Sequence, residues 1–239
     1  LERSLAEVRI KNPYTRAQWR EIIDTLIAQQ PFEDQGVYFQ VTRGVAKRDH
    51  AFPAGVEPTV FLMSNPLVNP SRELVENGGA AVTAVDNRWL RCDIKSISLL
   101  GNCLMRQLSA DCGAAETIMF RDGKLTEASA SNVFIVSKGI IIGPQKSNLI
   151  LPGITYDVVV EIARAQRMPL ELREVTEAEV RSAGEVWITS SSKEVLAIVT
   201  LDGKQVGSGR PGPVFGRMYQ GYQYFKQSVM RQRKQTVGA

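Results

Sequence analysis

Residues 88–96 read RWLRCDIKS and include a lysine, Lys95, next to their last residue. The following residues, 97–105 (ISLLGNCLM), carry no charge. This pattern predicts a helix after Lys95 and places the lysine amine next to an apolar helix face. Burial there would disfavour the ammonium form, and a neutral lysine amine can attack a carbonyl group. A solvated lysine at the start of a helix is the competing interpretation, so other segments must distinguish the two.

Residues 126–132 (TEASASN) place the carboxylate of Glu127 after an expected strand and before small residues. Small side chains let a flat molecule approach the backbone. A carboxylate that faces the nitrogen of a heteroaromatic ring keeps that nitrogen protonated and makes the ring an electron sink. A solvated surface glutamate is the alternative interpretation.

Two segments are suited to bind a phosphate. In residues 151–157 (LPGITYD), Gly153 precedes a helix start, so the amides of Ile154 and Thr155 and the Thr155 hydroxyl could converge on an anion. Residues 189–192 (TSSS) form a hydroxyl-rich turn at the end of a strand. Taken alone, an ordinary helix cap and an ordinary turn explain the two segments equally well.

The only histidine of the chain, His50, lies in the sequence RDH at residues 48–50. A single histidine excludes a multi-histidine metal site, and no nucleophile-elbow sequence accompanies it for a serine triad. Arg48 and His50 are two residues apart, so in an extended segment they would point to one side and could bind one carboxylate together. A loop histidine without a function is the alternative.

The composition is that of a globular protein. With 239 residues, 44% hydrophobic and 23% charged, the chain can bury one large core or two modest ones. Its 29 basic and 25 acidic residues leave a formal charge of +4, which favours small anionic ligands weakly and argues against nucleic acid. Three cysteines without metal-ligand spacing favour a reducing cytoplasm, and no apolar run predicts a membrane span or secretory signal.

Periodicity and turn residues predict a mixed order of elements. Helices are expected at the start of the chain, over 15–30, after residue 95, and over 154–166 and 213–232. Strands are expected over 37–43, 59–63, 81–85, 133–136, 140–142, 170–174, 185–189 and 195–201, with a hairpin turn at Asp122-Gly123. Because hairpins predominate over strict strand-helix alternation, the pattern favours an α+β fold over a doubly wound sheet.

The turn-forming residues 65–70 (NPLVNP) predict a boundary between a small N-terminal domain, 1–68, and a large domain, 69–239. Residues 1–10 have the apolar spacing of a helix, but no capping residue and no initiator methionine precede them. We therefore expect an N-terminal segment to be absent from this sequence, which would leave the small domain incomplete.

Taken together, these segments occur in the order and approximate spacing of the class IV, or fold type IV, pyridoxal-phosphate-dependent aminotransferases. Within that family the chain looks most like the D-amino-acid transaminases. The resemblance covers most of the chain and implies an α+β fold with mixed sheets flanked by helices, in which the large domain binds pyridoxal 5'-phosphate.

The resemblance also implies roles for the residues around the cofactor ring. Lys95 would form a Schiff base with the cofactor and then shuttle the proton between the substrate α-carbon and the cofactor. Glu127 would face the pyridine nitrogen, and Leu151 would lie beside the ring.

The phosphate and the substrate would be bound by other segments, as the resemblance implies. The phosphate would contact Ile154, Thr155, Ser190 and Ser191. Arg48 and His50 match the carboxylate trap of the D-specific enzymes, which reaches across the interface of a homodimer. The expected reaction is a ping-pong transfer of the amino group from a D-amino acid to a 2-oxo acid, as in D-alanine plus 2-oxoglutarate giving pyruvate plus D-glutamate.

The sequence departs from the family pattern in two places. No counterpart is found for an N-terminal tyrosine of the carboxylate trap or for an arginine that binds the phosphate, and Tyr156 stands where the family usually has a basic residue. Two alternatives on the same fold are a branched-chain L-aminotransferase and an aminodeoxychorismate lyase. A third alternative is a catalytically impaired binding protein.

Overall fold

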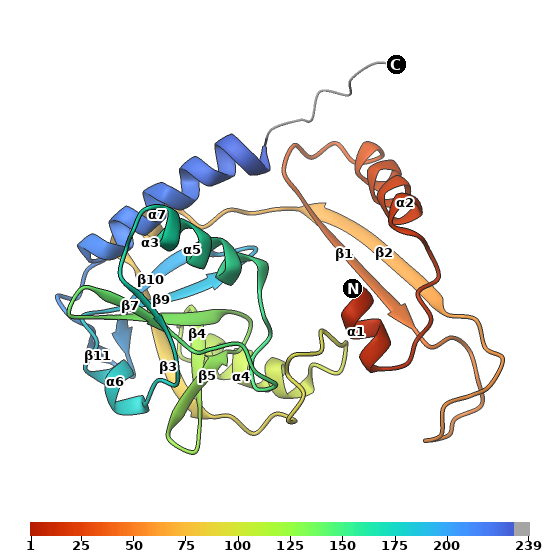
Figure 1. The fold of residues 1–239 in the computed structure, drawn as a ribbon, viewed down its shortest axis with the longest axis horizontal. Helices are drawn as coiled ribbons and strands as arrows, with labels where there is room; N and C mark the ends of the chain where they lie inside the picture. Colours follow the sequence, from red (N-terminus) through yellow and green to blue (C-terminus); the bar gives the residue numbers. More distant parts are fainter. Residues whose placement is uncertain (232–239) are drawn as a thin grey trace. The chain divides into compact units, whose positions relative to one another are not determined.

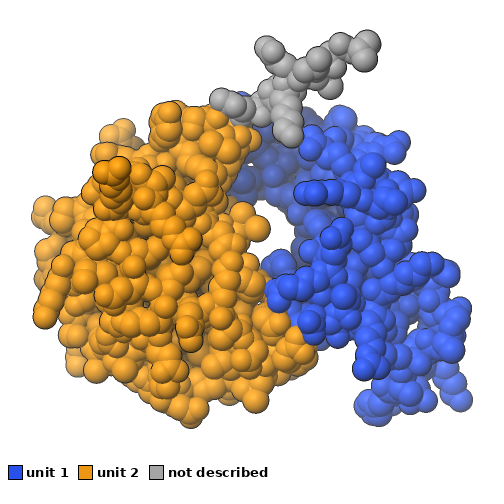
Figure 2. All heavy atoms as spheres, in the orientation of Figure 1, with its two compact units in different colours: residues 1–69, 94–98 blue, residues 70–93, 99–239 orange. Residues whose placement is uncertain are grey.

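A computed structural model describes residues 1–231 of the chain (Figure 1). These residues form two compact units, which Figure 2 shows in different colours. Unit 1 comprises Leu1–Asn69 and Ile94–Ser98, and unit 2 comprises Pro70–Asp93 and the chain from Leu99 onward. The sequence-based division after residue 68 assigns Lys95 to the large domain, whereas the structure groups the short segment around Lys95 with unit 1.

Unit 1 is built around a two-stranded antiparallel sheet. Its elements are α1 (Glu2–Glu7), α2 (Arg16–Ala28), β1 (Gln35–Thr42) and β2 (Thr59–Pro66). Helix α2 begins at a capping box, because the Thr15 hydroxyl accepts from the Gln18 amide and the Gln18 side chain accepts from the Thr15 amide. Trp19 on this helix is buried and packs against the ring of Phe39 on β1. These elements agree with the helix and strands predicted over 15–63.

Unit 2 contains one large mixed sheet. Its elements are α3 (Arg72–Asn77), β3 (Gly79–Val85), α4 (Leu100–Asp111), β4 (Glu116–Arg121), β5 (Lys124–Ala128), β6 (Asn132–Ser137), β7 (Ile140–Gly143), α5 (Ile154–Ala165), β8 (Leu170–Leu172), α6 (Glu177–Arg181), β9 (Glu185–Ser190), β10 (Glu194–Leu201), β11 (Lys204–Gln205), α7 (Pro213–Phe225) and the π-helix η1 (Lys226–Met230). The strand order is β5-β4-β3-β10-β9-β6-β7-β8, with β11 paired to β10.

Parallel pairing in this sheet is limited to β3 with β4, β3 with β10, and β7 with β8, and the other pairs are antiparallel. Antiparallel pairs can be joined by tight hairpins, whereas parallel pairs need a crossover connection. The mixture confirms the predicted α+β class and excludes a doubly wound sheet.

Alternating residues of β6, β9 and β10 divide the core into two clusters. On β6, Val133 and Ile135 belong to one cluster, whereas Phe134 and Val136 belong to the other. The second cluster also includes apolar residues of α5 and α7, which cover that face of the sheet (Figure 1). This alternation follows from the two-residue period of a strand, and each fully buried side chain contributes roughly 1.5–3 kcal/mol.

Three hairpin turns have the backbone conformation that their sequences predict. In each turn both central residues have positive φ, which the twist of a two-residue hairpin requires. The φ values are 51° and 72° at Asp122-Gly123, 51° and 78° at Lys138-Gly139, and 49° and 72° at Asp202-Gly203. The predicted hairpin of β4 and β5 is thereby confirmed.

The helices differ from expectation in three respects. The short helices α3 and α6 were not predicted, and the helix expected after Lys95 begins only at Leu100, because the Ser98 amide donates to the Ser96 hydroxyl instead of starting a helix. The helix expected over 213–232 is α7 followed by η1, and residue 232 lies outside the described residues. Among residues 1–231, no helix combines the length and the apolar character that crossing a membrane requires.

Candidate cofactor site

A β-bulge in β5 orients Glu127. Phe120 on β4 pairs with Leu125, whereas Ile118 pairs with Ala128, so two residues of β5 lie opposite a single residue of β4. Leu125 and Ala128 both contribute to the same core cluster. The extra residue therefore lets Glu127 leave that core, and bulges commonly redirect side chains in this way beside functional sites.

Three hydrogen-bond donors contact the carboxylate of Glu127, a residue that is only 5% exposed. Arg88 Nη1 donates at 2.6 Å, the Leu151 amide at 2.9 Å and Asn132 Nδ2 at 3.2 Å. Asn132 Nδ2 also donates to the Leu151 carbonyl oxygen at 2.9 Å. The structure thus brings the predicted residues Glu127 and Leu151 together and fixes the carboxylate in one orientation.

Arg88 is itself held by a second buried carboxylate, Asp86. Arg88 Nε and Nη2 donate to the two Asp86 oxygens at 2.9 and 3.0 Å, and the Thr126 hydroxyl donates to Asp86 at 2.8 Å. This bidentate contact fixes the guanidinium group that holds Glu127. Sequence reasoning missed the roles of Asp86 and Arg88, because an Asp-x-Arg spacing in a loop is common and nothing in the sequence pairs Arg88 with a residue on β5.

Burial dominates the electrostatics of this cluster. It raises the pKa of Glu127 to about 7, although the charge and hydrogen bond of Arg88 oppose the shift. Burial also acts to raise the pKa of Asp86, but the contacts from Arg88 and Thr126 outweigh it, so the pKa of Asp86 lies below its usual range. Near neutral pH Glu127 therefore binds a proton more readily than Asp86 does.

The raised pKa of Glu127 predicts a pH-dependent stability of the cofactor-free protein. Since the folded protein binds this proton more tightly than the unfolded chain, the contribution of Glu127 is fully present below its ordinary pKa of 4.5 and is lost as the pH rises through about 7. Between pH 4.5 and pH 8 the loss is about 3 kcal/mol. Urea unfolding of wild type and Glu127→Gln isolates this contribution, because the variant cannot titrate at residue 127. A stability difference that stays constant from pH 5 to pH 8 would contradict the prediction.

The N-terminus of α5 presents unpaired amides beside this cluster. Gly153 is the N-cap and supplies no side-chain cap, so the amides of Ile154 and Thr155 lack intrahelical partners. A Cβ atom at Gly153 would lie 2.5 Å from Asn132 Oδ1, so only glycine fits there. Thr155 is buried, whereas Ile154 is exposed. The predicted helix start is confirmed, and because a helix N-terminus attracts anions, binding of a phosphate there stays a prediction.

The hydroxyl-rich turn after β9 lies next to the same helix start. Asn132, which nearly touches Gly153, pairs with Thr189 on β9, and Ser190 and Ser191 follow directly. The Thr189 hydroxyl is buried and has no hydrogen-bond partner within residues 1–231. An unpaired buried hydroxyl is costly, so this atom is a candidate to bind an anion or another polar group.

Lys95 belongs to unit 1, and of the two interpretations of its surroundings the structure supports the solvated lysine. The Lys95 side chain is exposed, and its main-chain amide donates to the Ser4 hydroxyl of α1 at 3.1 Å. The helix expected directly after Lys95 begins only at Leu100, and Leu100 and Leu104 are themselves 74% and 57% exposed.

Arg48 and His50 lie in the exposed loop that connects β1 and β2 in unit 1. The expected extended segment is not formed there. Instead the Asp49 carboxylate accepts from the amides of His50 and Ala51, which bends the chain. The alternation of side chains along an extended strand therefore does not apply to Arg48 and His50.

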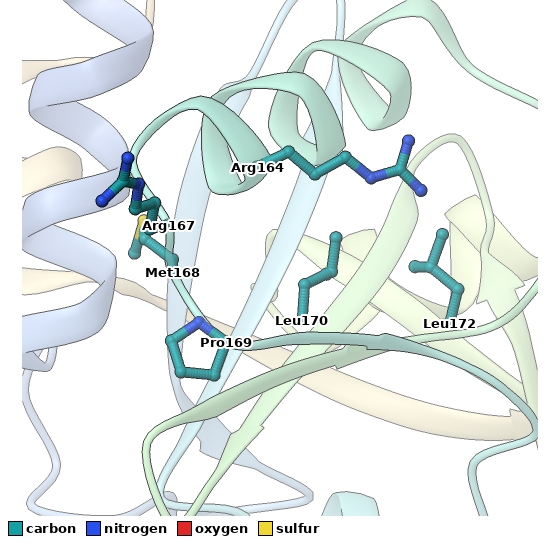
Figure 3. Close-up of a pocket in the computed structure, with 6 residues that line it drawn as sticks. All are labelled: Arg164, Arg167, Met168, Pro169, Leu170 and Leu172. Atoms are coloured by element: carbon teal, nitrogen blue, oxygen red, sulfur yellow. The ribbon is translucent and has the colours of Figure 1, made fainter.

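A pocket of about 460 Å³ lies at the opposite end of α5 (Figure 3). Arg164, Arg167 and Leu170 are among its lining residues. The described residues that line it provide neither a carboxylate nor a hydroxyl side chain, and none of the predicted site residues is among them. This pocket is therefore separate from the cluster around Glu127.

The chain belongs to the amino-transferase class IV family, whose sequence profile matches residues 1–201. It is accordingly an aminotransferase, as the resemblance in its sequence implies.

Several curated relatives are named D-alanine aminotransferase. The protein from Bacillus licheniformis is 39% identical over 214 residues, which cover 90% of this chain and 75% of the relative. The protein from Listeria monocytogenes serotype 1/2a (strain 10403S) is 37% identical over 231 residues, covering 95% of this chain and 78% of the relative. The protein from Staphylococcus haemolyticus is 36% identical over 227 residues, covering 95% and 80%.

Solved structures show the same fold. The branched-chain amino acid aminotransferase of Escherichia coli superposes with a TM-score of 0.86 at 21% identity, covering 99% of this chain and 79% of that one. The branched-chain aminotransferase of the archaeon Thermoproteus uzoniensis, solved with norvaline, superposes with a TM-score of 0.83 at 23% identity, covering 94% and 76%. At this identity the likeness establishes the fold and confirms the predicted fold type IV architecture.

Class IV aminotransferases use pyridoxal 5'-phosphate, and another branched-chain enzyme of the same fold was solved with pyridoxamine 5'-phosphate. The residues of unit 2 fit this group. The buried carboxylate of Glu127 is of the type that pairs with a protonated ring nitrogen. The free amides at the start of α5 and the unpaired hydroxyl of Thr189 are donors of the type that binds a phosphate. Asn132 connects the two kinds of donor, because it lies against Gly153 at the start of α5 and pairs with Thr189 on β9.

Proposed function

We propose that this chain transfers amino groups between D-amino acids and 2-oxo acids by a ping-pong reaction, with D-alanine and 2-oxoglutarate giving pyruvate and D-glutamate. The observation that carries the substrate assignment is the set of relatives named D-alanine aminotransferase, which are 36–39% identical over at least 90% of this chain. The branched-chain enzymes that share the fold are 21% and 23% identical, and they support no substrate assignment.

When bound, pyridoxal phosphate supplies an aldehyde that condenses with amines and a ring that accepts electrons. In this proposal Glu127 would hold a proton at the ring nitrogen, and Leu151, whose amide donates to Glu127, would lie beside the ring. The phosphate would be held by the amides of Ile154 and Thr155 and by the hydroxyls of Thr155, Ser190 and Ser191. The bidentate contact between Asp86 and Arg88 supports the assignment for Glu127, because it prevents the carboxylate from turning away.

Lys95 is proposed as the catalytic amine. Its amine would hold the cofactor and would move a proton to and from the α-carbon of the substrate. The main chain at Lys95 is held in place, because its amide donates to the Ser4 hydroxyl and the neighbouring residue Ile94 is buried. Its exposed side chain leaves the amine accessible to a small molecule.

Arg48 and His50 are proposed to bind the substrate carboxylate, from the partner subunit of a homodimer. Helix α4 supports an assembly of this kind, because it exposes an apolar row of Leu100, Leu104 and Leu108, which are 74%, 57% and 38% exposed. Residues at this four-residue spacing share one helix face, and exposed apolar rows typically mark protein interfaces.

A cytoplasmic location is also part of the proposal. Cys92, Cys103 and Cys112 are all free thiols, and two of them are exposed. Free exposed thiols are typical of a reducing compartment.

Steady-state transamination tests the substrate assignment. With 2-oxoglutarate as acceptor, we expect D-alanine to react faster than L-leucine, since the carboxylate trap decides which hydrogen of the α-carbon can approach the amine. Faster turnover of L-leucine would overturn the D-specific assignment and leave the family assignment intact.

Arg48→Ala is expected to raise the KM for D-alanine about 10- to 100-fold, because a charge-assisted hydrogen bond to a carboxylate contributes about 1.5–3 kcal/mol. The unfolding midpoint should not change, since Arg48 is exposed. Arg16→Ala, at another exposed position of unit 1, is the matched control and should leave the KM unchanged. An Arg48→Ala enzyme with the wild-type KM would exclude Arg48 from the trap.

A further inference from the structure

The turn between β9 and β10 is formed by residues 191–193, and its last residue, Lys193, reaches back into the protein. The Lys193 amide donates to the Ser190 hydroxyl at 3.1 Å, which closes the turn. Glu194 follows with a φ of 55°, so the turn ends in a left-handed residue, as three-residue hairpin loops commonly do. The backbone direction of Ser190 and Ser191 therefore depends on what holds Lys193 and Glu194.

A buried carboxylate holds Lys193. Lys193 Nζ lies 3.0 Å from Glu116 Oε1, and their side chains are 23% and 0% exposed. Glu116 is also bonded by the hydroxyls of Ser129 and Ser131 and by the Ala130 amide. Burial alone would raise the pKa of Glu116, but Lys193 and Ser129 outweigh it and hold the pKa below its usual value.

Glu194 is held by a second ion pair. Its carboxylate accepts from Lys226 of η1 and from Gln223 of α7. Lys193 and Glu194 are therefore each held by a separate ion pair, Lys193 to Glu116 of β4 and Glu194 to Lys226 of η1. The result is a hydroxyl-rich turn whose backbone is fixed by contacts that leave Ser191 and Ser192 exposed.

We propose that Lys193, anchored by Glu116, is a positioning residue that holds Ser190 and Ser191 in the conformation that binds the cofactor phosphate. This inference rests on the proposed function, because it assumes that the turn contacts the phosphate. Glu116 neutralises the Lys193 ammonium group, so the pair acts through geometry and not by adding charge to the site.

Comparison of two cofactor forms separates positioning from general stabilisation. Pyridoxal 5'-phosphate contains the phosphate and pyridoxal lacks it. The dissociation constant of pyridoxal divided by that of pyridoxal 5'-phosphate therefore measures the phosphate contacts alone. In Lys193→Ala we expect the ratio to fall about tenfold, because a few charge-assisted hydrogen bonds lose their alignment. Inorganic phosphate should compete with pyridoxal 5'-phosphate correspondingly less well in this variant. Both measurements are binding titrations and need no turnover.

Three further variants complete the experiment. Lys193→Arg keeps a cation within reach of Glu116 and should restore most of the ratio. Glu116→Gln should lower the ratio as Lys193→Ala does, and the double variant should be no worse than either single one, because both break the same contact. Lys204→Ala, at an exposed position of β11, is the matched control and should keep the wild-type ratio. Circular dichroism and thermal unfolding check that each variant is folded.

The outcomes distinguish the inference from the proposed function. A wild-type protein that does not prefer pyridoxal 5'-phosphate over pyridoxal overturns the phosphate site itself. A wild-type preference that persists in folded Lys193→Ala overturns the role of Lys193 alone. Equal loss of affinity for both cofactor forms would show that the ion pair only stabilises the fold, and it also overturns the inference. If Glu116→Gln does not fold, the Lys193 variants still decide the matter, because Glu116 keeps its donors from Ser129, Ala130 and Ser131.

Discussion

Lys95→Ala is expected to lower the rate of D-alanine transamination by at least about a thousandfold, which corresponds to about 4 kcal/mol of lost transition-state stabilisation. In the proposed mechanism, the variant loses both the amine that would attach the cofactor and the group that would move the α-proton. Since the side chain is exposed, the free energy of unfolding should change by less than about 0.5 kcal/mol. Pyruvate formation measures the rate, and mass spectrometry after borohydride reduction measures covalent attachment at residue 95.

Two other variants make this experiment specific. Lys95→Arg retains a cation at the position but provides no nucleophilic amine, so it should be as inactive as Lys95→Ala. Lys11→Ala removes an exposed lysine elsewhere in unit 1 and should keep wild-type activity and labelling. If borohydride attaches the cofactor to a different lysine, or if Lys95→Ala keeps a tenth of the wild-type rate, Lys95 is not the catalytic amine.

The features that could be predicted from the sequence are those encoded locally. The hairpin of β4 and β5 follows from Asp122-Gly123, whose residues tolerate the positive φ that the turn needs. Helix α5 follows from the periodic apolar residues after Gly153 and ends within a residue of the prediction. Its unpaired amide groups follow from the same boundary, so an anion site could be predicted there without knowledge of the fold.

The features that could not be predicted depend on contacts between distant residues. Arg88 and Glu127 are 39 residues apart, and their contact exists only because a bulge in β5 redirects the carboxylate. The link from Glu116 to Lys193 spans 77 residues. The sequence left the exposure of Lys95 open for another reason, because an uncharged apolar run can lie in the core or on an exposed surface.

Glu127→Gln is expected to lower kcat/KM for D-alanine by about a hundredfold, which is the usual effect of removing one preorganised electrostatic contact from an active site. Glutamine has nearly the same shape, but its single carbonyl oxygen can accept at only one of the two oxygen positions, either from Arg88 or from Leu151 and Asn132, so part of the surrounding contacts is lost. It also has no negative charge, and a neutral amide does not hold a proton on the ring nitrogen. The loss should therefore appear mainly in kcat, and the affinity for the cofactor should change less.

The charge of Glu127 can be separated from its packing by a direct measurement on the ring. The nitrogen-15 shift of labelled pyridoxal 5'-phosphate should indicate a protonated ring nitrogen in the wild-type protein and an unprotonated one in Glu127→Gln. Glu161→Gln removes an exposed carboxylate from α5 and should resemble wild type in both shift and turnover. A Glu127→Gln enzyme within threefold of the wild-type rate, with the ring nitrogen still protonated, would show that another group supplies the proton. The buried arrangement of Asp86, Arg88 and Glu127 would then serve only the stability of the sheet, and the double hydrogen bond from Arg88 to Asp86 would remain as its main contribution.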